Sequence, residues 1–190
     1  VITGIANLIE SRDGSTGLHV KNTQNYVQIL TKALREKGMY PDILDHNYEL
    51  NTVKASVLHD IGKIKTPDAI LLKPGRLTDE EFEVMKQHTV AGCEIIDRII
   101  GNVEHEEYVD IARKIARYHH ERWDGTGYPD GLSGEEIPLC ARIMALADVF
   151  DALYQDRCYK KAIRPASKVF EIIKENSGSQ SVSYTHLRAH

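Results

Sequence analysis

The sequence predicts an all-α fold, a compact helical bundle, from three observations. Apolar residues recur at helical spacing, as in Val20, Val27, Leu30 and Leu34. No stretch shows the sustained alternation of apolar and polar residues that is typical of a half-buried strand. The one long irregular segment covers residues 122–138, where four glycines and two prolines collect. A loop of that length inside a compact domain is usually functional or disordered.

Local signals place the first helices in order. The stripe that contains Val20 and Val27 predicts a helix over residues 17–37, and Gly38 is suited to end it. A second helix is expected over residues 48–59. Thr78 and Glu81 have the spacing of a capping box, which opens a third helix.

Four further helices are expected in the second half of the chain. Residues 90–100 place Ile95, Ile96 and Ile99 on one side, and residues 139–154 are strongly apolar. Pro165 suits the first turn of the last helix, because that position has no backbone hydrogen bond to lose. The expected ranges are 90–100, 104–120, 139–154 and 166–175.

Bulk composition limits the classes of function. The 190 residues carry a net charge of -4, with 42% hydrophobic and 27% charged residues. This balance is ordinary for a globular domain and argues against a binder of nucleic-acid polymers. No two of the three cysteines lie close together in the sequence. No apolar run approaches the length that spans a membrane, and the sequence shows no signal peptide. We expect a cytoplasmic location and no membrane segment.

Adjacent pairs of metal-binding residues are the main chemical signal. A lone histidine is more often a surface or hydrogen-bonded core residue than a ligand. His59-Asp60 and His119-His120, however, each end an apolar helical segment, and Asp148 lies inside one. A buried carboxylate needs a partner, because an unpaired charge inside a protein is costly. A divalent cation is one such partner.

The number of candidate ligands exceeds what one ion needs. Imidazole and carboxylate without thiolate suit Fe or Mn better than structural zinc. Two divalent ions with a bridging carboxylate would use the set naturally and would suit phosphoryl chemistry, with a bridging hydroxide as nucleophile. Lys63, three residues after Asp60, is either a contact for substrate phosphate or a solvated lysine. The seven candidate ligands are His19, His59, Asp60, His88, His119, His120 and Asp148.

Two motifs resemble one known family. The segments His59-Asp60-Ile61-Gly62-Lys63 and His119 to Pro129 are similar to those of the HD-GYP branch of the HD metal-dependent phosphohydrolases. Shorter matches surround His19, His88 and Asp148, and the resemblance covers residues 9–175. It implies an HD-type helical bundle over residues 1–176 with a glycine- and proline-rich loop.

The resemblance also implies roles for individual residues. One metal is expected at His19, His59, Asp60 and Asp148, and the second at His88, His119 and His120, with Asp60 as the bridge. Asp60 and Lys63 are expected to be catalytic. The phosphates of the substrate are expected at Lys63, Arg157 and Lys160. The signature loop, which shapes the rim of the site, is expected at Gly127, Tyr128 and Pro129.

The family hydrolyses cyclic di-GMP to pGpG and often on to GMP, and some members prefer other cyclic dinucleotides. Members usually follow a sensor or receiver domain, so we expect such a domain upstream in the full-length chain. The chain begins within an apparent helix, which fits a fragment. Residues 177–190 resemble a translated sequencing adapter rather than family sequence, with a genuine flexible tail as the alternative.

Some positions depart from the family pattern. Some members bind a third metal through a glutamate four residues before the first histidine, and Ser15 stands there, so two metals are expected. Glu10 and Asp13 are nearby acids outside the matching position. Asn22 replaces a usual arginine.

Other functions remain open. A degenerate domain that binds a ligand or partner is the main alternative. The sequence also leaves open a hydrolase of linear nucleotides and oxygen chemistry at a di-iron site, although the second histidine set and Lys63 favour a phosphodiester substrate.

Overall fold

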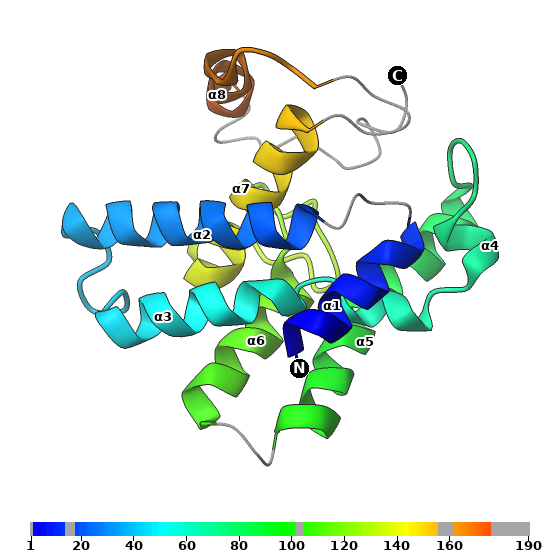
Figure 1. Ribbon diagram of the computed structural model, residues 1–190, viewed down its shortest axis with the longest axis horizontal. Helices are drawn as coiled ribbons and strands as arrows, with labels where there is room; N and C mark the ends of the chain where they lie inside the picture. Colours follow the sequence, from blue (N-terminus) through cyan, green and yellow to red (C-terminus); the bar gives the residue numbers. More distant parts are fainter. Residues whose placement is uncertain (1, 14–17, 102–104, 156–161, 176–190) are drawn as a thin grey trace.

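The computed structural model describes residues 2–13, 18–101, 105–155 and 162–175, and these form a bundle of helices (Figure 1). Within these residues there is no strand, and one isolated bridge joins Asp124 to Ser133. The predicted all-α fold is confirmed. The α helices are α1 (Ile2–Glu10), α2 (His19–Glu36), α3 (His46–Ala55), α4 (Asp68–Leu71), α5 (Asp79–Ile100), α6 (Glu106–Tyr118), α7 (Leu139–Tyr154) and α8 (Ala166–Glu175). Short 3-10 helices are η1 (Ser11–Asp13), η2 (Ser56–Leu58), η3 (Ile61–Lys65) and η4 (Gly134–Glu136).

Side-chain caps explain where two helices begin. The Thr78 hydroxyl accepts the backbone N–H of Glu81, and the Glu81 carboxylate accepts the N–H of Thr78, which completes the predicted capping box. Asp45 caps α3 by accepting the N–H of Tyr48. The segments predicted to start at Thr78 and to cover 90–100 are one continuous helix, α5, of 22 residues.

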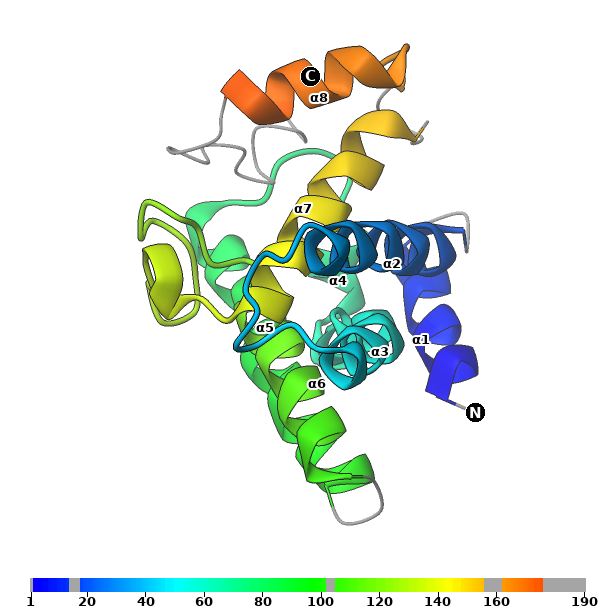
Figure 2. The same ribbon diagram turned by 90° about the vertical axis from the view of Figure 1, so that its left-hand side faces the viewer.

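The helices pack in two pairs that α7 crosses. Helices α2 and α3 lie side by side, and α5 packs against α6 below them (Figures 1 and 2). Helix α7 contacts both α2 and α6, so its apolar residues are largely buried. The shared core removes a large apolar area from water and is the main source of stability. Its largest fully buried side chains include Val20, Val27, Ile96, Ile111, Ile115 and Met144.

The turn between α3 and α4 is held tightly against α5. A Cβ atom added at Gly62 would lie 1.8 Å from the carbonyl oxygen of His88 and 2.5 Å from the amide nitrogen of Gly92. Only glycine therefore allows η3 to approach α5 this closely. The contact brings His59 and Asp60, just before η3, next to His88.

The glycine-rich loop leaves the bundle after α6 and returns at α7 (yellow-green in Figure 2). Glu121, which is 3% exposed, organises its return. Its carboxylate accepts the backbone N–H groups of Asp130, Gly131 and Leu132 at 2.7 to 3.1 Å. The loop is therefore ordered by hydrogen bonds to one buried side chain.

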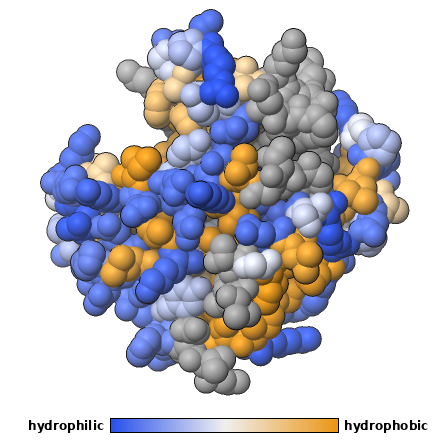
Figure 3. Space-filling view, viewed as in Figure 1, coloured by the Kyte–Doolittle hydropathy of each residue, from blue (hydrophilic) through white to orange (hydrophobic). Residues whose placement is uncertain are grey.

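The surface seen in Figure 3 is mostly hydrophilic, with apolar side chains gathered near α1. Ile5 and Leu8 of that helix are 37% and 69% exposed. Among the described residues, no helix combines the length and hydropathy needed to cross a bilayer.

Candidate metal centre

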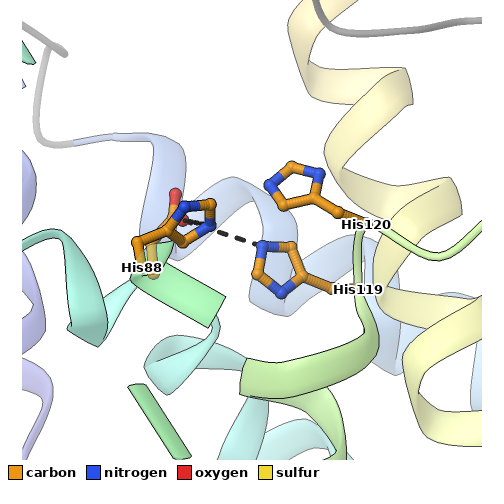
Figure 4. A group of neighbouring side chains, drawn as sticks. His88, His119 and His120 are labelled. Carbon is orange, nitrogen blue, oxygen red and sulfur yellow. Dashed lines mark ion pairs between the residues drawn. The ribbon is translucent and has the colours of Figure 1, made fainter. Parts of the chain in front are cut away.

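Five histidines from four parts of the chain meet in one place. His19 begins α2, His59 lies between η2 and η3, His88 is on α5, and His119-His120 follows α6. Neighbouring rings have centroids 4.1 to 5.6 Å apart. Figure 4 shows the rings of His88, His119 and His120 converging on a common space.

Backbone contacts turn the Nε2 atoms of three histidines into this space. The Nδ1 atom of His59 lies 2.8 Å from the carbonyl oxygen of Ser56, and that of His88 lies 2.7 Å from the carbonyl oxygen of Met85. His119 Nδ1 contacts the carbonyl oxygens of Ile115 and Ala116 at 3.0 and 3.1 Å. A proton on Nδ1 is held by these carbonyl oxygens, so Nε2 is the ring atom that can bind a metal ion.

The candidate ligand atoms form two groups that share Asp60. Within each group, all ligand atoms lie within 4.8 Å of one another. Asp60 Oδ1 lies 3.4 Å from His88 Nε2 and 3.7 Å from His119 Nε2, whereas Oδ2 lies 3.4 Å from His59 Nε2. One carboxylate thus presents an oxygen to each group. The first group is Glu10, His19, His59 and Asp60, and the second is Asp60, His88, His119 and His120.

Buried polar atoms at this place fit divalent metal ions. Among the described residues, Nε2 of His59, His88 and His119 and Oδ1 of Asp60 are buried without a hydrogen-bond partner. Unsatisfied polar atoms are rare in protein interiors and call for an explanation. Nitrogen and carboxylate oxygen are the donors that Fe and Mn accept. The residues present therefore fit the predicted metal ions.

A match to a family model covers nearly the whole structure. Residues 6–182 match the model described as HD domain. The chain belongs to the HD domain family. The predicted HD-type bundle is confirmed. The prediction that the chain belongs to a family of enzymes is confirmed as well.

Curated relatives of this HD domain are phosphodiesterases of cyclic dinucleotides. A Vibrio cholerae protein named cyclic di-GMP phosphodiesterase is 47% identical over 180 residues, 93% of this chain and 36% of the relative. The cyclic di-GMP phosphodiesterase response regulator RpfG of Xanthomonas campestris is 41% identical over 85% of this chain and 39% of the relative. The 3'3'-cGAMP-specific phosphodiesterase 2 of Vibrio cholerae is 39% identical over 84% of this chain and 28% of the relative.

These relatives confirm the resemblance to the HD-GYP branch. The chain spans less than two fifths of the length of these three proteins.

Lys63 is part of the centre of the HD domain. Its Nζ lies 2.6 Å from Asp60 Oδ2, and its side chain is 12% exposed. Lys63 is therefore close to the candidate ligands, as the spacing of three residues predicted, and it is not a fully solvated lysine.

Burial and nearby charges change the pKa values of the two histidine groups in opposite directions. Burial lowers the pKa of His88 to about 4 and that of His120 well below its usual value. Burial also acts to lower the pKa of His59, but Asp60 together with Asp148 and Glu10 outweighs burial and raises this pKa to about 9. Burial would raise the pKa of Asp60, but Lys63 and His59 hold it well below the usual range. His88 and His120 of the second group therefore offer neutral imidazoles, the form that binds metal.

Asp148 and Asp151 approach His19 from one turn of α7. Asp148 Oδ1 lies 3.4 Å from His19 Nε2, which places Asp148 at the edge of the first group. Asp151 Oδ2 lies 2.6 Å from His19 Nδ1 and is the partner that orients this ring. Sequence reasoning gave Asp151 no role, although its spacing of three from Asp148 on a helix placed both on one face.

Glu10 is the second residue that sequence reasoning missed. It was expected to lie outside the matching position for a ligand, but Oε1 lies 3.6 Å from His19 Nε2 and the residue belongs to the first group. Glu10 is 2% exposed. A buried acid at the end of an apolar helix was the signal that could have identified it, as it identified Asp60.

The signature loop supports the second group from outside. The ring of Tyr128 stacks on that of His120, with centroids 4.8 Å apart and an angle of 27°. A Cβ atom at Gly127 would lie 2.4 to 2.6 Å from the backbone of residues 120–122, so a side chain there would displace the loop. Pro129 follows through a cis peptide bond. The loop therefore positions a candidate ligand.

Several predictions fall outside the described residues. The expected phosphate contacts Arg157 and Lys160, the position of Ser15 and the segment 177–190 lie there.

Proposed function

We propose that this domain hydrolyses the phosphodiester bonds of cyclic di-GMP to pGpG, and on to GMP, with two divalent metal ions. The observation that carries the proposal is the division of Asp60 between two groups of histidines. One carboxylate with an oxygen directed to each group is the arrangement that a bridged pair of ions requires.

The described ligand atoms suggest how the ions would be held. When bound, two divalent ions would supply an activated water for attack at phosphorus and would offset charge on the phosphate oxygens. Either Fe or Mn fits the donor set. One ion would be held by His19, His59, Asp60 and Asp148, and the other by Asp60, His88, His119 and His120.

Lys63 is the proposed contact for substrate phosphate. Its ammonium group pairs with the carboxylate of Asp60. Once the charge of Asp60 is shared with cations, the Nζ of Lys63 can turn to an anionic phosphate oxygen, and a charge-assisted hydrogen bond of this kind contributes about 1.5–3 kcal/mol. Arg157 and Lys160 are proposed as further phosphate contacts.

Cyclic di-GMP is the proposed substrate because it is named for several relatives that match most of this chain. Another cyclic dinucleotide, 3'3'-cGAMP, is the second candidate, since three relatives are named as specific for it.

The test is hydrolysis by protein that is purified without oxygen and loaded with Fe(II) or Mn(II). The substrates are cyclic di-GMP and 3'3'-cGAMP, with pGpG and GMP measured as products. The variant Asp60→Asn, which keeps the size of the side chain but removes its charge, should lose at least about 100-fold in rate. The control Asp110→Asn breaks only an exposed pair with Lys114 and should keep full activity.

Two outcomes would contradict the proposal. Loaded wild-type protein that hydrolyses neither substrate would favour a domain that only binds its ligand. Full activity of Asp60→Asn would contradict the assignment of Asp60 as the bridging ligand.

Further proposals concern the boundaries of the domain, a neighbouring domain and the location of the protein. We propose that residues 1–176 are the catalytic domain and that 177–190 contribute nothing to it. An upstream sensor or receiver domain is proposed because one relative is named a response regulator. A cytoplasmic location is supported by the unpaired Cys93 and Cys140.

A further inference from the structure

We infer that Glu10 is a ligand of the first metal ion, a third carboxylate beside Asp60 and Asp148. This inference rests on the two-ion centre of the proposed function. It adds a residue from α1 to that centre.

The position of Glu10 is the first argument. Its Oε1 lies 3.6 Å from His19 Nε2, and its ligand atom lies within 4.8 Å of those of His19, His59 and Asp60. Atoms that bind one ion at about 2.1 Å must lie within roughly 4.2 Å of one another, so only small movements would bring the four together around an ion. Asp148 does not belong to this group.

Charge is the second argument. Two divalent ions bring four positive charges into a site whose ligands are almost entirely buried. Asp60 and Asp148 offset two of them, and the neutral imidazoles offset none. Glu10 supplies a third negative charge at 2% exposure, beside His19 and His59.

The local structure explains why Glu10 is held at this point. Oε2 accepts the backbone N–H of Val20 at 3.2 Å, in the first turn of α2. Leu18, the N-cap residue of that helix, offers no side-chain cap. One oxygen therefore stabilises the helix end that carries His19, while the other faces the candidate ligands.

A role in capping alone is the competing explanation, and Glu10→Gln separates the two. The amide oxygen of glutamine can still accept the N–H of Val20, but the side chain is no longer an anionic ligand. A purely structural role predicts that the variant binds both ions as the wild type does. A ligand role predicts that it loses at least about tenfold in affinity for one ion, because loss of even an outer partner of a metal ligand commonly costs 10–100-fold.

The experiment titrates metal-free protein with Mn(II) or Co(II) without oxygen and measures the stoichiometry and affinity of each ion. The visible spectrum of Co(II) is a second readout, because it reports the ligands directly and should change in Glu10→Gln. The control is Glu49→Gln, another buried glutamate, which pairs with Arg35. Arg35 lies 16 residues beyond His19 on α2, about 24 Å along the helix, so this control should keep wild-type metal binding.

Wild-type affinities and an unchanged Co(II) spectrum in Glu10→Gln would overturn the inference. If this variant does not fold, Glu10→Asp keeps the charge but withdraws it by one methylene. Glu10→Asp should then have a lower affinity for the first ion than the wild type, and wild-type affinity would again overturn the inference. Hydrolysis of cyclic di-GMP by the wild type is measured in parallel. Two bound ions without hydrolysis would refute the proposed function and leave the role of Glu10 intact.

Discussion

His19 differs from its neighbours in the group that holds its Nδ1 atom. His59, His88 and His119 contact backbone carbonyl oxygens, whereas His19 contacts the carboxylate of Asp151 at 2.6 Å. A carboxylate partner fixes the tautomer and increases the basicity of the ring. Burial acts to lower the pKa of His19, but the carboxylates of Asp151, Asp148 and Glu10 together outweigh burial and raise this pKa.

Replacing Asp151 by asparagine should therefore lower the affinity for the first metal ion by about 10–100-fold. Asparagine keeps the size of the side chain but lacks the charge that orients His19. Titration of metal-free protein with Mn(II) measures the effect, and Asp110→Asn on the surface of α6 is the matched control. Equal affinities in Asp151→Asn and wild type would show that His19 needs no charged partner.

Short elements, more than the long helices, determine the distances within the centre. The turn that contains η2 and η3 carries His59 and Asp60 and packs on α5 through Gly62. The loop after α6 is ordered by Glu121 and supports His120 through Tyr128. The turn and the loop each place candidate ligands beside residues that are distant in sequence.

Gly62→Ala should lower the free energy of unfolding by about 3 kcal/mol, because its Cβ would overlap the backbone of α5. Urea denaturation measures this loss. The control Gly4→Ala, in α1, has no heavy atom within 4 Å of the added Cβ and should be neutral or stabilise the protein by about 0.5–1 kcal/mol. Similar stabilities for Gly62→Ala and the wild type would mean that η3 and α5 can separate at little cost.

Glu121→Ala should cost about 2–3 kcal/mol, since it removes the acceptor of three backbone N–H groups. Hydrogen exchange should accelerate at residues 130–132, while Glu121→Gln, which keeps one oxygen acceptor, should show a smaller effect. Unchanged exchange in Glu121→Ala would contradict the anchoring role.

At the scale of the whole molecule, the centre lies where α2, α5, α6 and α7 meet. Its ligands come from positions between 10 and 148 of the chain, so the centre exists only when the bundle is folded. An ion that binds the folded chain but not the unfolded one stabilises the fold by mass action.

Removal of metal should therefore lower the melting temperature. Free metal at 100 times its Kd adds about 2.7 kcal/mol, which corresponds to a shift of about 5–10 °C for a domain of this size. Thermal unfolding with a chelator, and after Mn(II) is restored, measures the shift. A double variant, His88→Ala with His119→Ala, should lose much of it. Identical midpoints with and without metal would contradict a centre that couples to folding.

The sequence by itself determined the all-α class, most helix ranges and the residues around the HD and GYP motifs. These features depend on local information. A helical stripe repeats within four residues, the capping box at Thr78 needs only Glu81, and His119-His120 are adjacent. For the same reason, the prediction that Lys63 lies beside Asp60 needed only one helical turn.

The resemblance implied the division of the ligands into two groups, and only the tertiary structure decided which further side chains reach them. Glu10 approaches His59 because α1 packs on η2 and η3, and Tyr128 reaches His120 because Glu121 orders the loop. Neither contact follows from spacing along the chain. They result from the packing of apolar faces, which acts between segments far apart in sequence and carries polar side chains with it.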